Sequence, residues 1–317
     1  AGSDDQNGDV YTIGTIEVSV DKPIINQEPA TTFRIEGGEI EHMQANSLGD
    51  ALELTPGVVN KGVNGLSKSN KTSVRSLGIG SDGSLESFGT QVMVNDIPMN
   101  NNAGMSTVGG MSGMAGNNSE SGIDLRMIPA DNIEKIEVVQ GIPSVKYGDL
   151  SEGLIKVETK NIPEKTKFKV KYSEDTKEFS LTKGQEWRKM IFSGSFNYAY
   201  SERDIRKEGD EWVRLSGNMK ISRKKEKENR FHWVFSFLGT KYIDDVEPSD
   251  YLREKNYNHG YITGQNIKAQ YRFTKRLETE FSLFFTYRKE DLYKSKLVEG
   301  DPVSYLGEVW DKGNSYN

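Results

Sequence analysis

The chain has 317 residues, of which 34% are hydrophobic, with a net charge of −6 and no cysteine. Its mean hydropathy is −0.66, and it contains no run of about 18 apolar residues, so membrane-spanning helices are excluded. Membrane strands are not excluded, because they need only every second residue to be apolar. Lysine and arginine are dispersed, which argues against nucleic acid as a partner. The length allows two domains.

The first third of the chain predicts short elements separated by turns. A helix is predicted at 48–54, because Ser47 is a good N-cap and Asp50 follows it at a distance close to the capping-box spacing.

Two contrasting segments follow. Residues 100–122 are rich in Gly, Asn, Ser and Met, and have too little branched or aromatic content to pack, so a mobile loop is predicted. Residues 124–160 contain an apolar strand at 133–139, a break at Gly141 and a second apolar strand that begins near Leu154. With a short helical segment between the strands, we interpret this stretch as a βαβ-like unit.

From Phe168 onward, apolar and polar residues alternate. Such strands, about 10 to 14 residues long, exceed the usual 5 or 6 and suit tilted strands that cross a bilayer in about 9 to 11 residues. A soluble antiparallel sandwich is the alternative interpretation. The apolar positions are Phe192, Phe196, Tyr198 and Tyr200; Val213, Leu215, Met219 and Ile221; Phe231, Trp233, Phe235 and Phe237; Ile267, Ala269, Tyr271 and Phe273; and Phe281, Leu283, Phe285 and Tyr287.

The connections between these strands differ in length. Outer-membrane barrels have short periplasmic turns and longer external loops, so the two groups are assigned to opposite sides. Short connections are predicted at 184–187, 224–229 and 274–275, and mostly longer ones at 201–210, 243–260 and 291–303. The acidic stretch 244–250 is predicted to be a solvated external loop, with binding of a cation or a basic partner as the alternative.

Four segments in the correct order resemble the plug domain of TonB-dependent outer-membrane receptors. They are SLGDALELTPGVV at 47–59, TSVRSLG at 72–78, QVMVNDIPM at 91–99 and IPADNIEKIEVVQGIPSVKYGDLSEGLIKVETK at 128–160. The third has Asn95-Asp96-Ile97-Pro98 where the family usually has a VDG-P pattern. The strand half resembles the family only in its alternating pattern.

The resemblance implies a fold class: an α+β plug domain, with a small mixed sheet and short helices, inside a transmembrane antiparallel β-barrel. We expect an N-terminal segment at 1–30, the plug at 31–163 and the first part of the barrel at 164–317. Seven or eight strands are predicted there, whereas a barrel that encloses a plug has about 22 strands. The chain is therefore predicted to be the N-terminal part of a longer receptor.

The resemblance also implies a function. It is active import of a scarce, bulky ligand (siderophore, haem, cobalamin, peptide or glycan) through the outer membrane of a Gram-negative bacterium, with a TonB-type energy transducer in the periplasm as partner. Three alternatives stay open: a binding or signalling receptor, the pore partner of a surface lipoprotein, and a soluble β-rich adhesin. No enzyme is expected, and no catalytic residue, metal site or cofactor is predicted, because no such motif is present.

Two segments are candidate sites by resemblance. One resembles a TonB box, which would pair by β-augmentation with the transducer; its residues are Thr15, Ile16, Glu17, Val18, Ser19 and Val20. The other is the plug loop at 100–122, where family members contact the ligand. Its candidate residues are Asn100, Asn101, Asn102, Met105, Met111, Met114, Asn117 and Asn118. Together with Met99, these methionines also suggest a Cu(I) site, but flexible filling or contact with an apolar ligand is favoured.

Structural roles are expected for six further plug residues. A buried Arg75 would need a carboxylate partner, and Glu134, Glu137 or a barrel carboxylate would supply it; a solvated arginine at a strand end is the alternative. Gly141, Tyr147 and Gly148 are predicted to form the two turns between the strands of 124–160.

Overall fold

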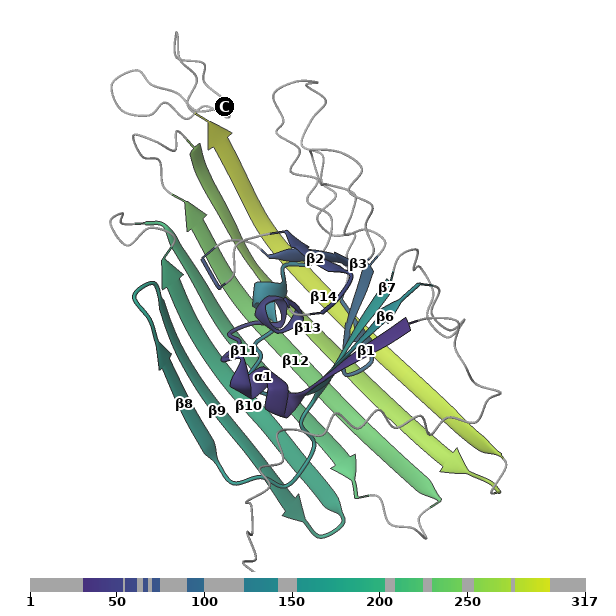
Figure 1. Ribbon diagram of the computed structural model, residues 1–317. Helices are drawn as coiled ribbons and strands as arrows, with labels where there is room; N and C mark the ends of the chain where they lie inside the picture. The colour runs from purple at the N-terminus through teal and green to yellow at the C-terminus, as the bar shows by residue number, and fades with distance from the viewer. Residues whose placement is uncertain are drawn as a thin grey trace, which may run out of the picture.

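The structure is a computed structural model (Figure 1), which describes residues 31–53, 55–61, 65–67, 70–74, 90–99, 123–141, 153–202, 209–224, 230–246, 254–274 and 277–296. The described chain forms an inner domain, from β1 to β7, and a wall, which is the seven-stranded sheet from β8 to β14. The inner domain lies against one face of the wall (Figure 1). No helix in the described ranges is long and apolar enough to span a membrane.

A mixed five-stranded sheet forms the centre of the inner domain. Its strand order is β1-β6-β7-β4-β5, and β2 and β3 form a separate pair. The strands are β1 (Thr31–Glu36), β2 (Val58–Lys61), β3 (Lys71–Val74), β4 (Thr90–Val94), β5 (Ile97–Pro98), β6 (Ile133–Gln140) and β7 (Gly153–Thr159). The helices are α1 (Gly37–His42), α2 (Leu48–Leu52) and the 3-10 helix η4 (Leu125–Met127).

The pairing of β6 with β7 corrects one expectation. The two strands are antiparallel, with Ile136 opposite Val157 and Val138 opposite Ile155, whereas a βαβ unit requires parallel strands. The βαβ-like interpretation was therefore wrong. This antiparallel register places the buried apolar residues of both strands opposite each other, where cross-strand pairs stabilise the sheet.

Helix α2 begins as predicted. The Ser47 hydroxyl accepts a hydrogen bond from the Asp50 amide at 3.4 Å, and the Asp50 carboxylate accepts one from the Ser47 amide at 3.1 Å. This reciprocal capping box satisfies amide groups that the first helical turn leaves without partners. The helix ends at Leu52, two residues earlier than expected.

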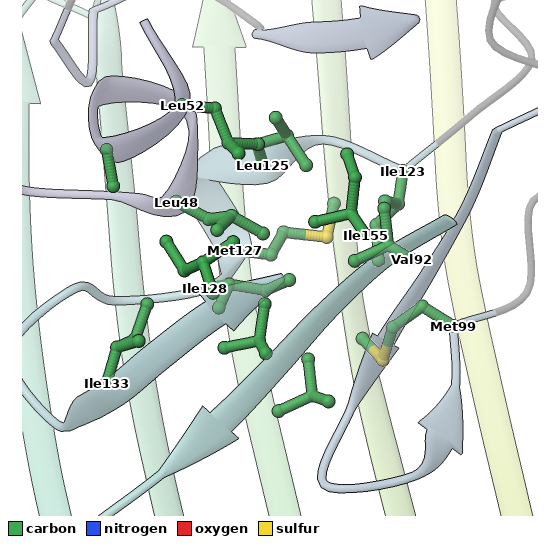
Figure 2. Packing of buried hydrophobic residues seen from close by; sticks show 14 of the residues in the cluster. Leu48, Leu52, Val92, Met99, Ile123, Leu125, Met127, Ile128, Ile133 and Ile155 are labelled. Carbon is green, nitrogen blue, oxygen red and sulfur yellow. The ribbon is translucent and has the colours of Figure 1, made fainter. Parts of the chain in front are cut away.

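One apolar core joins the inner domain to the wall. Figure 2 shows Leu48 and Leu52 of α2 in one cluster with Leu125, Met127 and Ile155. The same cluster of buried residues includes three side chains of the wall. Because this core contains residues of both the inner domain and the wall, burial of apolar surface holds the two together and also stabilises the fold of each. The wall residues of the cluster are Leu238, Tyr242 and Ile262.

The wall is a single antiparallel sheet in which every strand pairs with the next. Its strands lengthen along the chain, from 6 residues in the first to 19 in the last two. They are β8 (Lys167–Tyr172), β9 (Thr176–Trp187), β10 (Met190–Glu202), β11 (Glu211–Arg223), β12 (Phe231–Val246), β13 (Glu254–Arg272) and β14 (Glu278–Lys296).

The predicted alternation along the wall strands is confirmed. Polar side chains such as Asn197 and Ser216 are buried on the face toward the inner domain, while Leu215 and Phe281 are 44% and 61% exposed on the opposite face. A soluble sandwich would bury its apolar face between two sheets. The described wall instead leaves that face open, as a membrane strand does toward lipid, so the sandwich interpretation was wrong.

The expected loop at 243–260 is largely strand. Residues Ile243 to Val246 of β12 pair with His259 to Asn256 of β13, and β14 likewise continues to Lys296. Alternation of apolar and polar residues is weak in this part of the sequence, so the pattern gave no strand signal. The backbone pairing continues nevertheless, because hydrogen bonding of a ladder does not depend on side-chain polarity.

Residues 160–166 connect β7 to β8, and this linker is attached to the wall. The amides of Glu164 and Gly184 each donate to the other residue's carbonyl oxygen at 3.1 Å, which forms the linker bridge. A Cβ atom at Gly184 would lie 2.1 Å from the Ile162 carbonyl oxygen. Only glycine therefore allows the linker to approach β9 this closely.

Candidate functional site

A group of buried charged residues lies where η4 meets strands β9 to β12 of the wall. Asp124 is the N-cap of η4, and its carboxylate accepts a hydrogen bond from the Arg126 amide at 3.0 Å. This cap turns the Arg126 side chain back onto Asp124 and toward the wall. Arg126 is only 1% exposed, so its charge needs partners within the protein.

Arg126 has partners on both sides of the contact. Its guanidinium lies 2.6 Å from the Asp124 carboxylate and 2.7 Å from the Asp244 carboxylate of β12, and it donates to the Leu66 carbonyl oxygen at 3.0 Å. Burial alone would lower the pKa of Arg126, but the two carboxylates outweigh burial and raise the pKa. The guanidinium therefore stays charged and ties η4 to the wall.

Arg214 of β11 provides a second tie from the opposite direction. Its fully buried guanidinium binds the Glu178 carboxylate of β9 at 2.7 Å and donates to the Asn197 side-chain oxygen at 3.0 Å. It also donates to two carbonyl oxygens of the inner domain, that of Asn46 at 3.0 Å and that of Arg126. The Arg214 side chain thus joins two parts of the inner domain, the segment before α2 and the helix η4.

The Trp212 ring contacts both guanidinium groups. Its centroid is 4.9 Å from the guanidinium carbon of Arg126 and 5.5 Å from that of Arg214. Leu66 and Ala199 complete its buried apolar surroundings. A desolvated cation over an indole face is stabilised by the ring quadrupole. We name the six residues of this site the latch: Asp124, Arg126, Glu178, Trp212, Arg214 and Asp244.

Asp131 forms a second ionic contact next to the latch. Its carboxylate lies 3.1 Å from the Lys169 ammonium and 3.6 Å from that of Lys171, and it accepts a hydrogen bond from Asn197 at 3.0 Å. Lys171 also donates to the Ala45 carbonyl oxygen at 2.6 Å. Burial alone would raise the pKa of Asp131, but Lys171 and Lys169 outweigh it and lower the pKa.

This lowered pKa predicts an acid-sensitive contact. A carboxyl group whose pKa falls on folding stabilises the folded state above its ordinary pKa of 3.8, and loses that contribution as the pH falls through the folded value. The melting temperature should therefore be steady near neutral pH and decrease below about pH 4. The Asp131→Asn variant should have a lower melting temperature than the wild type at neutral pH. Its melting temperature should also fall less steeply than that of the wild type as the pH is lowered. Parallel curves for the two proteins would contradict the assignment.

The turn between β4 and β5 is a third contact with the wall. Asn95 and Asp96 have φ values of 53° and 61°, as the two central residues of a type I′ turn require. The Asp96 carboxylate lies 2.9 Å from the Lys268 ammonium, and the Asn266 side chain donates to the Asn95 carbonyl oxygen at 3.0 Å. Both partners come from β13, so the turn is fixed to the strand next to the last one of the wall.

Most of the predicted site residues lie outside the described ranges. This is true of all six residues of the TonB-box-like segment 15–20 and of all eight candidate residues in the plug loop 100–122. It is also true of Arg75, Tyr147 and Gly148. Within the ranges that are described, no three His, Cys, Asp or Glu side chains are grouped so that they could hold a metal ion.

The other predicted residues have partners within the inner domain. The Glu137 carboxylate lies 2.8 Å from Arg34 of β1, 3.4 Å from Lys135 and 3.5 Å from Lys156. Burial alone would raise its pKa, but these cations lower it. Glu134 is exposed on β6.

Gly141 directly follows β6, with a φ of +103° that favours glycine.

Sequence reasoning missed the latch. Asp244 was expected in a solvated loop, but its side chain is 12% exposed and bound to Arg126. Arg214 and Glu178 stand on the polar face of alternating strands, where neighbours are mostly Ser, Thr and Asn. Large charged residues on a face that packs against a second domain need buried partners, and this was the available signal.

Comparison with known proteins identifies the inner domain. The family model described as the TonB-dependent receptor plug domain matches residues 25–153. No curated protein matches the sequence.

Among solved structures, the siderophore receptor PiuA from Acinetobacter baumannii is similar with a TM-score of 0.57 at 14% identity, over 84% of this chain and 37% of that receptor. The alcaligin outer-membrane receptor FauA from Bordetella pertussis has a TM-score of 0.58 at 11% identity, with 86% and 42% covered. The ferric-catecholate import receptor Fiu from E. coli K12 has a TM-score of 0.57 at 12% identity, with 86% and 40% covered.

The chain thus spans less than half the length of these receptors, and at such identities the likeness concerns the fold. The fold agrees with the family match, since a plug domain lies against antiparallel membrane strands. Residues 25–153 therefore match the plug domain of TonB-dependent receptors, and the described chain has the fold of the plug and first barrel strands of such outer-membrane receptors.

Proposed function

We propose that this receptor actively imports a scarce, bulky ligand across the outer membrane, with a TonB-type energy transducer as its periplasmic partner. The observation that carries the proposal is the latch, because it holds the plug against the wall through buried charges instead of a large apolar surface alone. Buried ion pairs need good geometry to be favourable, and removal of one partner is costly. Such a contact suits a plug that must be firmly seated and still be released.

The latch lies between the two proposed working ends of the plug. The loop 100–122, with its candidate ligand contacts, leads directly into Asp124 and Arg126. The TonB-box-like segment 15–20 precedes β1 at the other end of the plug sequence. A ligand that moves the loop would act on Asp124. A pull on the N-terminal segment would act on the segment before α2, whose Asn46 carbonyl oxygen accepts a hydrogen bond from Arg214. Both inputs therefore converge on the same buried contacts.

Ferric siderophores are the first ligand class to test. Two of the three similar structures are named as receptors for a siderophore and for ferric catecholates, and the shared fold gives this class priority. Haem, cobalamin, peptides and glycans follow. A growth screen under limitation of each nutrient, with and without the receptor, would select the ligand for the experiments below.

Deletion of residues 15–20 tests the proposed energy coupling. Cells with the deletion should bind the selected labelled ligand normally but accumulate none of it, because the segment for β-augmentation with the transducer is missing. Deletion of the polar residues 3–8, which removes the same length of chain, is the matched control and should leave uptake unchanged. Normal uptake by the 15–20 deletion, or loss of binding, would refute the box assignment.

A further inference from the structure

The outer face of strands β12 to β14 changes in character along the strands. Phe281, Leu283 and Phe285 of β14 form an apolar belt, and each is at least 60% exposed on the face away from the plug. Tyr287 follows at 45% exposure and contacts Tyr261 of β13, with ring centroids 5.6 Å apart. Aromatic residues of this kind mark the edge of the hydrocarbon layer. The surface beyond Tyr287 therefore faces the polar part of the membrane.

A row of two lysines with a tyrosine between them lies directly beyond this edge. Lys241 of β12 is opposite Tyr261 of β13, and Tyr261 is opposite Lys289 of β14. Opposite residues of antiparallel strands point to the same face with Cβ atoms about 5 Å apart. The three side chains therefore present two ammonium groups around one phenol hydroxyl. All three are exposed on the face away from the plug.

These lysines have little anionic compensation from the residues that the structure describes. Lys241 makes no ion pair with any residue of the described ranges, and Lys289 lies 3.7 Å from an exposed Asp291. Lysine on the lipid face of a membrane strand is costly in the hydrocarbon and tolerated near the interface. Cations at this depth attract anionic lipid head groups. The row thus has the position and the charge to bind phosphate.

Further along the same face, the side chains become polar and aromatic. His259 lies 2.6 Å from the Asp245 carboxylate. Tyr257 stacks on Tyr293 with centroids 5.1 Å apart and an interplanar angle of 8°. Tyrosine pairs an apolar ring with a polar hydroxyl, which matches the C–H faces and hydroxyls of a sugar. Along the strands, the apolar belt is therefore followed by the row of two lysines and then by a pair of tyrosines that suits a sugar.

We propose that this face binds a phosphorylated glycolipid of the outer leaflet, with its phosphate between Lys241 and Lys289 and its saccharide along Tyr257 and Tyr293. A glycerophospholipid would supply the acyl chains and a phosphate, but no saccharide for the aromatic pair. The proposal requires the end of the wall at which β12 ends and β13 begins to face outward, as expected for the barrel. It does not require import activity.

The test measures lipid retained by the receptor after extraction from outer membranes and exchange into detergent with added lipid. Native mass spectrometry should detect bound bisphosphorylated glycolipid on the wild type. The double variant Lys241→Gln, Lys289→Gln should retain at most about one tenth of the glycolipid that the wild type retains, because two phosphate contacts are lost. The double variant Lys165→Gln, Lys183→Gln removes the same charge near the opposite end of the wall and should retain the wild-type amount. The wild type should retain enzymatically dephosphorylated glycolipid and phosphatidylglycerol poorly. The amount of each should not exceed the amount of phosphorylated glycolipid that the Lys241→Gln, Lys289→Gln variant retains.

Equal retention by all three proteins would overturn the proposal, as would phosphatidylglycerol that is retained as well as the glycolipid. Equal losses in both double variants would indicate general charge attraction and would also overturn it. The assay contains no transducer and no import ligand, so its outcome is independent of the uptake experiment. An unchanged melting temperature of both variants would confirm that exposed lysines were replaced without loss of the fold.

Discussion

Replacement of Arg126 with leucine is expected to release η4 from the wall. The variant removes the guanidinium that binds both the Asp124 and the Asp244 carboxylates, whose side chains are 10% and 12% exposed. Removal of one partner from a buried ion pair costs about 3–5 kcal/mol. Amide hydrogen exchange at 123–128 should therefore become about 100-fold faster or more, since about 1.4 kcal/mol corresponds to a factor of ten. Cells with the variant should also admit bulky antibiotics that a seated plug excludes.

The matched control for this variant is Arg272→Leu. Arg272 is 55% exposed, and its guanidinium lies 3.9 Å from Glu278, so its loss should change exchange in the plug very little. Asp244→Asn retains the side-chain shape and removes one charge, and it should have an intermediate effect. If Arg126→Leu exchanged no faster than Arg272→Leu, the latch would not be what holds the plug.

Replacement of Arg214 with leucine should destabilise the plug contact by a similar amount, and a second change should restore part of the loss. Arg214→Leu leaves the Glu178 carboxylate, 1% exposed, without its guanidinium. Glu178→Leu in the same protein replaces the pair with apolar side chains, which is often close to neutral. Recovery should remain incomplete, because the Asn46 and Arg126 carbonyl oxygens still lack their donor.

Thermal unfolding of the wild type, both single variants and the double variant provides a double-mutant cycle for this pair. The double variant should be more stable than Arg214→Leu alone. Arg214→Lys should be intermediate, since one ammonium group cannot reproduce the planar fork that serves several acceptors at once. Strictly additive losses in the cycle would show that Glu178 and Arg214 are not coupled.

The parts of the fold that follow local rules were predictable from sequence. Ser47 and Asp50 identify the start of α2 because both partners of the capping box lie within one turn. Alternation around Phe196 and Leu215 identifies the wall strands because successive side chains point to opposite faces. Both signals depend on residues close together in the chain.

The latch was not predictable in the same way. Arg126 and Asp244 are 118 positions apart in sequence, and nothing near Asp244 distinguishes it from an acidic residue of a solvated loop. Its partner follows only from the placement of η4 against β12, which depends on the whole apolar core. The antiparallel pairing of β6 with β7 was missed for a related reason, since two apolar strands and a turn are compatible with either direction.

The linker bridge between Glu164 and Gly184 has a consequence for how far the plug can travel. Two main-chain hydrogen bonds keep this end of the linker on β9, and they are independent of the latch charges. A plug released from its ionic contacts would swing about this tether, with the smallest displacement near Thr159 and the largest at segments remote from it. Return to the seated position would then be an intramolecular step with a high effective concentration, so a displaced plug would regain its contacts with the wall without a search for its partner surface.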